Sequence, residues 1–86
     1  MKLTGRLIKN TAIIKEAVIE KDDETASYTD LLEECLIGLC RELDIQVPLW
    51  LKKNTAEFVK YHRTFFTKEQ FMENVRFERF EIKLEL

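Results

Sequence analysis

The sequence predicts a single small α+β domain built around a three-stranded antiparallel sheet. Two stretches rich in β-branched residues, 2–9 and 12–20, predict an N-terminal β-hairpin. Apolar residues at helical spacing between 28 and 43 predict one long helix, and alternating apolar residues after 75 predict a C-terminal strand. We expect the hairpin and the last strand to form the sheet, with the long helix and two or three short helices packed on one face.

The hairpin turn is expected at Asn10-Thr11, between the two β-branched stretches. The register that follows pairs Ile8 with Ile13, Leu7 with Ile14 and Leu3 with Val18. The face expected to point toward the core then carries Leu3, Leu7, Ile14 and Val18. The opposite face carries Ile8, Ile13, Ala17 and Ile19. This second face is too apolar for a sheet surface that meets only water, so it predicts a contact site.

The long helix is expected at residues 28–43. Ser27, with Asp30 three residues later, forms an N-terminal capping signature. Leu and Cys residues between 31 and 43 cover about half of the helix surface, which predicts its buried side. Ile37 falls outside that arc, among charged residues. Gly38 lies inside the helix and can admit a closely packed neighbour.

The central stretch, residues 45–71, predicts three short helical pieces joined by bends. Pro48 suits the first position of a short helix that Lys52 and Lys53 would end. Asn54 with Glu57 predicts a second helix, reaching about residue 62, and Thr67 with Gln70 predicts a third. Aromatic residues are expected to pin these pieces to the core: Trp50, Phe58, Tyr61, Phe65, Phe66 and Phe71.

The C-terminal strand contains two alternating apolar sets that are out of phase. The first set is Val75 and Phe77, and the second is Phe80, Ile82, Leu84 and Leu86. A β-bulge at residues 78–79 would place both sets on one face, so we expect one there.

Composition favours a folded cytoplasmic protein. Of the 86 residues, 45% are hydrophobic and 35% are charged, which is typical of one globular domain. Residues 1–20 have no signal-peptide pattern, and no apolar run approaches the ~18 residues of a membrane span. Cys35 and Cys40 lie five positions apart in the predicted helix, a spacing that fits neither a disulfide nor a zinc site. Reduced, buried thiols are therefore expected.

The inventory of reactive residues predicts a protein that is not an enzyme. His62 is the single histidine, and no Ser, Cys or Asp lies at a recognisable catalytic spacing from it. Gly5 and Gly38 are the only glycines, too few for a phosphate-binding loop. We expect no catalytic residue, no cofactor and no metal site. An enzyme whose site forms between subunits is the least favoured alternative.

Charge is unevenly distributed although the net charge is only −2. Residues 21–44 carry eight acidic and two basic side chains, a net charge of −6. Residues 49–68 carry one Glu against five basic residues, a net charge of +4: Lys52, Lys53, Lys60, Arg63 and Lys68. Basic residues interleaved with aromatics are typical of nucleic-acid surfaces. The aromatics are better explained as core residues, with the basic side chains on the solvated outer face, and we favour this explanation.

The segments LCRELDIQVPLWLKKNTAEF, TFFTKEQF and VRFERFEI resemble a group of short uncharacterised bacterial proteins over roughly residues 36–82. The resemblance implies a cytoplasmic bacterial protein of unknown role. It implies no activity, cofactor or site residue.

These observations predict a non-enzymatic interaction module that associates with itself or with another protein. The predicted contact surface is an edge strand or the outer hairpin face with Ile8, Ile13 and Ile19. The alternative is a nucleic-acid-binding accessory protein that uses the five basic residues of 49–68. The sequence does not predict the order of the strands.

Overall fold

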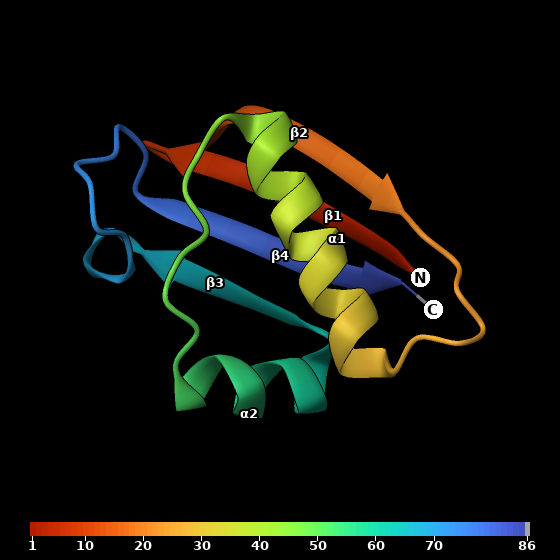
Figure 1. Cartoon of the computed structure of the whole chain (residues 1–86). Helices are drawn as coiled ribbons and strands as arrows, with labels where there is room; N and C mark the ends of the chain where they lie inside the picture. Colours follow the sequence, from red (N-terminus) through yellow and green to blue (C-terminus); the bar gives the residue numbers. More distant parts are fainter. Residues whose placement is uncertain (86) are drawn as a thin grey trace.

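The computed structural model describes residues 1–85 and contains a four-stranded antiparallel sheet with two helices on one face (Figure 1). The elements in chain order are β1 (Lys2–Lys9), β2 (Ala12–Glu20), α1 (Tyr28–Leu43), α2 (Lys52–Tyr61), β3 (Arg63–Thr67), the 3₁₀ turn η1 (Lys68–Gln70) and β4 (Arg79–Glu85). The strand order is β2-β1-β4-β3, so β2 and β3 are the edges. The predicted α+β class is confirmed, and the three-stranded sheet is corrected to four strands.

The fourth strand, β3, lies where short helical pieces were expected. Thr64 and Phe66 point inward from it and are buried, and it pairs with β4 along its whole length. The helix predicted from Pro48 does not form, and Lys52 begins α2 instead of ending a helix. The third predicted piece is the single turn η1 after Thr67.

The hairpin turn at Asn10-Thr11 is confirmed. Both residues have positive φ, 52° and 64°, the conformation of a type I′ turn that matches the twist of the strands. Ile8 faces Ile13 as expected. The register then shifts, because Ile14 is an extra residue without a cross-strand partner. This β-bulge was not predicted.

The bulge changes which residues of β2 face the core. Leu3 pairs with Ile19 instead of Val18, so Ile19 lies on the helix-covered face together with Ala17. A Cβ built on Gly38 of α1 would be 3.4 Å from the Ile19 side chain, which confirms that the helix packs there. Val18 and Ile14, expected in the core, are 44% and 51% exposed. Of the predicted apolar outer face of the hairpin, Ile8 and Ile13 still face each other, whereas Ala17 and Ile19 lie on the helix-covered face.

Helix α1 has the predicted bounds. The Ser27 hydroxyl accepts a hydrogen bond from the Asp30 N–H at 3.1 Å, as its capping signature predicted. The buried side chains of α1 lie over β1 and β2, while Ile37 is 38% exposed, outside the apolar arc as expected. Gly5 lets α1 approach β1 closely, because a Cβ there would be 2.9 Å from the Phe80 ring and 3.1 Å from Leu39.

The C-terminal strand begins at Arg79, without the predicted bulge at residues 78–79. Phe77 precedes the strand and Phe80 belongs to it, and both are buried because residues 71–78 are irregular. The N–H of Glu78 donates to the carbonyl of Ile8 at 2.8 Å, which ties this irregular segment to β1. Leu86, expected to continue the strand, lies outside the described residues.

Candidate functional site

A buried polar network lies between α2, β3 and η1. Asn54, in the first turn of α2, is fully buried. Its Oδ1 accepts from the Leu51 N–H at 2.9 Å and from Gln70 Nε2 at 3.0 Å. Its Nδ2 donates to Thr64 Oγ1 at 2.8 Å and to the Phe65 carbonyl at 3.0 Å. The amide therefore uses both its donors and both acceptor positions, which offsets the cost of burying it.

This network partly closes the β3 edge of the sheet. The N–H of Leu84 in β4 donates to the carbonyl of His62. The backbone N–H and C=O groups of the even-numbered residues of β3 therefore point toward β4. Odd-numbered residues consequently point their backbone groups outward. The outward carbonyl of Phe65 accepts from Asn54, and the outward N–H of Thr67 donates to Gln70 Oε1 at 3.1 Å. The sequence predicted Asn54 and Gln70 only as helix-capping residues.

The opposite edge, β2, is open. The N–H of Glu78 donates to the carbonyl of Ile8. The backbone N–H and C=O groups of even-numbered β1 residues therefore point toward β4, and those of odd-numbered residues point toward β2. Because Leu3 pairs with Ile19, the backbone N–H and C=O groups of the odd-numbered residues 15–19 of β2 point toward β1. The N–H and C=O groups of Glu16, Val18 and Glu20 therefore point outward. Within residues 1–85 no hydrogen bond covers these outward groups.

The two charged residues in the middle of β2, Lys15 and Glu16, do not extend over this edge. Lys15 Nζ donates to the Leu43 carbonyl at the end of α1, at 3.1 Å. Glu16 accepts from Arg6 Nε at 2.6 Å, so it is held toward β1. Proteins usually protect edge strands with charges, a short strand or a cover. β2 has nine residues and half-exposed apolar side chains, including Ile13 at 53%, so it fits strand addition.

The structure brings together two of the three residues predicted for self-association. Ile8 and Ile13 face each other next to the hairpin turn, and Ile8 is buried. Ile19 lies on the opposite, helix-covered face because of the bulge. The predicted set is therefore corrected, and the open edge of β2 is the feature that remains.

The five basic residues predicted as a nucleic-acid patch all lie on the side of the closed edge. Lys52 and Lys53 begin α2, Lys60 lies near its end, Arg63 begins β3 and Lys68 is in η1. All five are exposed, and none is within 4.0 Å of a carboxylate of the described residues. Glu57 of α2 and Glu69 of η1 lie in the same elements, so the positive charge of this region is partly neutralised.

The neighbouring aromatics mostly belong to the core, as the favoured explanation predicted. Phe58, Phe66 and Phe71 are buried, and Trp50 packs against the first two at centroid distances of 5.7 and 5.6 Å. Phe65 is partly buried, with Lys53 and Arg79 over its ring at 5.3 and 5.5 Å. Tyr61 is the exception, because it is 56% exposed.

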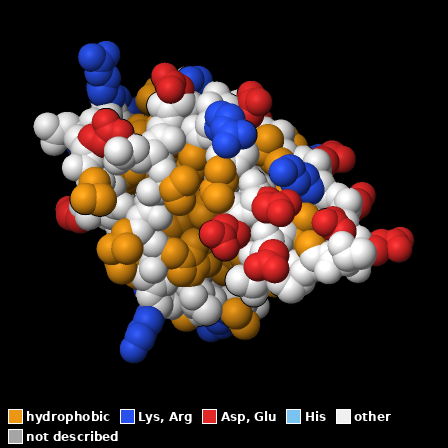
Figure 2. Space-filling model, in the orientation of Figure 1, with side chains coloured by type: hydrophobic (Ala, Val, Ile, Leu, Met, Phe, Trp, Pro, Cys, Tyr) orange, Lys and Arg blue, Asp and Glu red, His pale blue; other side chains and the backbone are white. Residues whose placement is uncertain are grey.

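A second apolar surface lies on the helix-covered side. Figure 2 shows hydrophobic side chains gathered between α1 and the segment that leads to α2. This segment, residues 44–51, exposes Val47, Leu49 and Leu51, of which Leu49 is 63% exposed. Its backbone is fixed by a pair of hydrogen bonds between Leu49 and Gln70, of 2.7 and 2.9 Å. The surface is thus held by the same network that closes β3.

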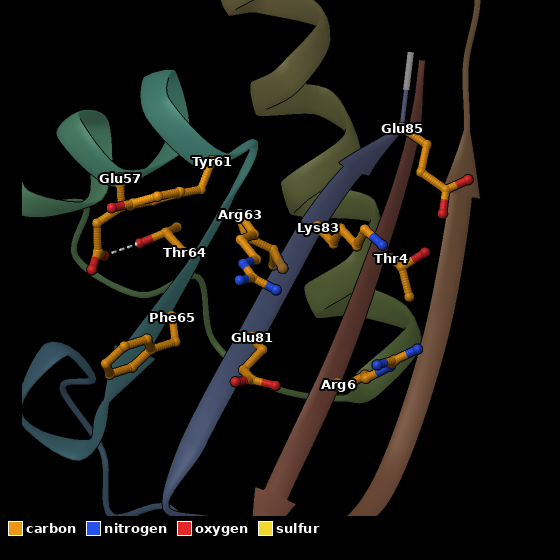
Figure 3. A pocket seen from close by; sticks show the side chains of 11 residues that line it. Thr4, Arg6, Glu57, Tyr61, Arg63, Thr64, Phe65, Glu81, Lys83 and Glu85 are labelled. Atoms are coloured by element: carbon orange, nitrogen blue, oxygen red, sulfur yellow. Dashed lines mark hydrogen bonds between the residues drawn. The ribbon is translucent and has the colours of Figure 1, made fainter.

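The open face of the sheet contains a hollow of about 280 Å³, lined mostly by polar and charged residues (Figure 3). Charges of both signs line it in equal number: Arg6, Arg63, Lys83, Glu57, Glu81 and Glu85. Lys83 is the cross-strand partner of Arg63, yet its ammonium points away toward Thr4 (Figure 3). The cations therefore do not converge on one point.

The thiols of Cys35 and Cys40 are buried and unpaired. Burial raises the pKa of both, that of Cys40 to about 12, so they are protonated at neutral pH. Protonated thiols are poor nucleophiles and poor metal ligands. No group of three or more His, Cys, Asp or Glu among residues 1–85 is placed to hold a metal ion.

No family model matches the chain, and comparisons with curated proteins and with solved structures find no match. Neither α1 nor α2, the helices within residues 1–85, has the length and apolar character needed to cross a membrane.

Proposed function

We propose that the protein is a small non-enzymatic interaction module that binds an extended protein strand along the free edge of β2. An added strand would supply partners for the outward N–H and C=O groups, and it would contact the half-exposed side chains of the edge. The partner is a second copy or another protein. The buried free thiols support the cytoplasm as its location.

The contrast between the two edges carries this proposal. On β3, the outward carbonyl of Phe65 and the outward N–H of Thr67 are bonded by side chains of the same chain. Those of Glu16, Val18 and Glu20 on β2 have no such cover among residues 1–85. Exposed edge strands pair readily with other chains, so an uncovered edge in a folded domain favours a binding role.

The test uses proline as a probe of the edge. In Val18→Pro the ring replaces an outward N–H, a position that an edge strand tolerates, so the fold should persist. The variant should lose the partners that wild type captures from a cell lysate, as measured by mass spectrometry. The surface variant Lys52→Glu with Lys53→Glu should keep them. If Val18→Pro folds and retains every partner, β2 is not the docking edge.

A parity control accompanies this experiment. The N–H of Ala17 points toward β1, so Ala17→Pro should break the β1–β2 ladder and lose the circular-dichroism signal of the fold. Equal damage by Val18→Pro and Ala17→Pro would mean that the outward residues of β2 are assigned wrongly.

The unpaired basic residues of α2, β3 and η1 support nucleic-acid binding as a second candidate function. Phosphate contacts release counterions, so affinity for an oligonucleotide should fall steeply with salt. We expect no more than non-specific micromolar binding at physiological ionic strength, because the aromatics nearby are mostly buried. A nanomolar, salt-sensitive complex that Lys52→Glu with Lys53→Glu abolishes would make this function the leading one.

A further inference from the structure

We infer that the strand that binds β2 is the β2 strand of a second copy, antiparallel to the first, with Ala17 on the twofold axis. This inference rests on the proposed function and names its partner and its register.

The hydrogen-bonding pattern restricts the possible registers. Glu16, Val18 and Glu20 direct their backbone groups outward, so hydrogen-bonded pairs between the copies must join even-numbered residues. In an antiparallel pair of strands related by a twofold axis, the numbers of two facing residues always add up to the same sum S. Because even-numbered residues face even-numbered residues, S must be even. The axis then passes through a single residue of the strand. Beyond the bulge at Ile14, an axis at Ile19 or Glu20 would pair at most three residues of β2, so the remaining axes pass through Lys15, Glu16, Ala17 or Val18.

Charge selects one of these four registers. An axis at Lys15 places Lys15 opposite itself, and an axis at Glu16 places Glu16 opposite itself. An axis at Val18 places Glu16 opposite Glu20 of the second copy. Like charges directly opposite each other on neighbouring strands are destabilising. An axis at Ala17 places Glu16 opposite Val18 and Lys15 opposite Ile19, so no two like charges face each other.

Side-chain size and neutralisation agree with the Ala17 register. Ala17 is small and lies on the helix-covered face, so two copies of it can meet on the axis next to the helices. Glu16 approaches the acidic residues of the second copy only diagonally, and Arg6 binds it within its own chain. Lys15 is likewise held by the Leu43 carbonyl.

The resulting dimer has a defined architecture. A twofold axis perpendicular to the sheet keeps both α1 helices on the same face, one on each side of the new β2–β2 seam. Because β2 and β3 are the two edges of each sheet, the two sheets join into one sheet of eight strands with β3 at both ends. Asn54 and Gln70 occupy two of the outward backbone groups of β3 in both copies, which disfavours addition of a further copy at that edge.

The register can be tested by a single cysteine. Residues that face each other in a non-hydrogen-bonded antiparallel pair have Cα atoms about 4.5 Å apart, within the range of a disulfide. In this register Ala17 is such a self-facing pair, so Ala17→Cys should form a disulfide-linked dimer under mild oxidation. Val18→Cys and Ile19→Cys face Glu16 and Lys15 of the second copy, so they should cross-link several-fold less. Wild type, with Cys35 and Cys40 buried, should not cross-link.

Light scattering on wild type at ~100 µM tells whether the protein is a dimer. Together with the partner-capture experiment, it distinguishes failure of the dimer proposal from failure of the proposed binding at β2. A dimer that Val18→Pro dissociates, together with selective cross-linking at position 17, supports both. A dimer that cross-links best at position 18 or 19 overturns the register and leaves the β2 edge as the site. A monomeric wild type overturns the second copy as partner, whereas the partner-capture comparison still decides whether the edge binds another protein.

Discussion

The two edges of this sheet present their backbones to the surroundings in opposite ways. β3 has five residues, and two of its outward backbone groups are bonded to side chains of the same chain: the Phe65 carbonyl to Asn54 and the Thr67 N–H to Gln70. β2 has nine residues, and no group within residues 1–85 covers its outward backbone. The difference teaches that edge protection in this domain is specific. The β3 edge is protected by the buried amides of Asn54 and Gln70, which lie on that side of the sheet only. Protection by surface charge in general would have covered both edges.

Chain order explains why only β3 is covered. His62 adopts a left-handed conformation with φ of 57° and reverses the chain, so α2 folds back along the strand that follows it. The helix thereby brings Asn54 next to Phe65. β2 is followed by the polar connection of residues 21–27, and α1 then returns across the face of the sheet (Figure 1). Nothing in that path runs beside the edge of β2.

The largest expected effect comes from opening the closed edge. Asn54→Ala removes all four side-chain hydrogen bonds of a fully buried amide, two of which join it to the buried side chains of Thr64 and Gln70. We expect the free energy of unfolding, measured by urea denaturation, to fall by about 3 kcal/mol. The uncovered β3 should also make the protein aggregate faster in light scattering.

Asn74→Ala is the matched control, because Asn74 is exposed in the irregular segment before β4. It should change stability by less than about 0.5 kcal/mol. Similar losses in both variants would show that the network does not hold the β3 edge.

A smaller effect should come from the two glycines that set the distance between α1 and the sheet. Gly5→Ala would place a methyl group 2.9 Å from the Phe80 ring, so it should destabilise the fold by about 1–3 kcal/mol. Gly38→Ala meets Ile19 at an ordinary 3.4 Å and improves helix propensity, so it should stabilise by about 0.5–1 kcal/mol. Thermal unfolding of both variants checks the signs. A stabilising Gly5→Ala would mean that α1 does not press on β1.

The smallest expected effect concerns salt and the open edge. Dimerisation through β2 brings together two copies of the acidic residues 21–44, whose net charge is −6. Raising salt from about 0.1 M to 1 M shortens the Debye length from about 10 Å to about 3 Å, so association should strengthen roughly threefold. Sedimentation equilibrium at both salt concentrations measures this. Weaker association at high salt would indicate an interface held by opposite charges instead of a strand pair.

Local signals in the sequence were enough to predict α1 and the hairpin turn. The Ser27 cap and the apolar spacing act within one helix, and the turn at Asn10-Thr11 needs only the adjoining strands. The register beyond the turn was wrong, because the bulge depends on distant contacts. Ile19 packs against Gly38, and Lys15 reaches the end of α1.

The candidate site was less accessible to sequence reasoning than the helix. An edge strand was expected as one possible contact surface, but which strand is open depends on the order β2-β1-β4-β3, a non-local property. β3 was missed because its five residues lie between two helix-capping signals and are stabilised by pairing with β4. The sealing role of Asn54 followed from neither spacing nor composition, since it requires Phe65 and Gln70 to be brought beside it in space.

The bulge at Ile14 also bears on how this hairpin tolerates changes in length. Ile13 and Lys15 already face Ile8 and Leu7 as neighbours would in a regular hairpin, with Ile14 as the additional residue. Loss of this one codon would leave every later side chain of β2 on its present face. Deletion of Glu16 or Val18 would move the side chains of part of β2 to the opposite face of the sheet and expose apolar residues to water. Position 14 is therefore where β2 can lose a residue without changing which side chains of Lys15–Glu20 face the helices.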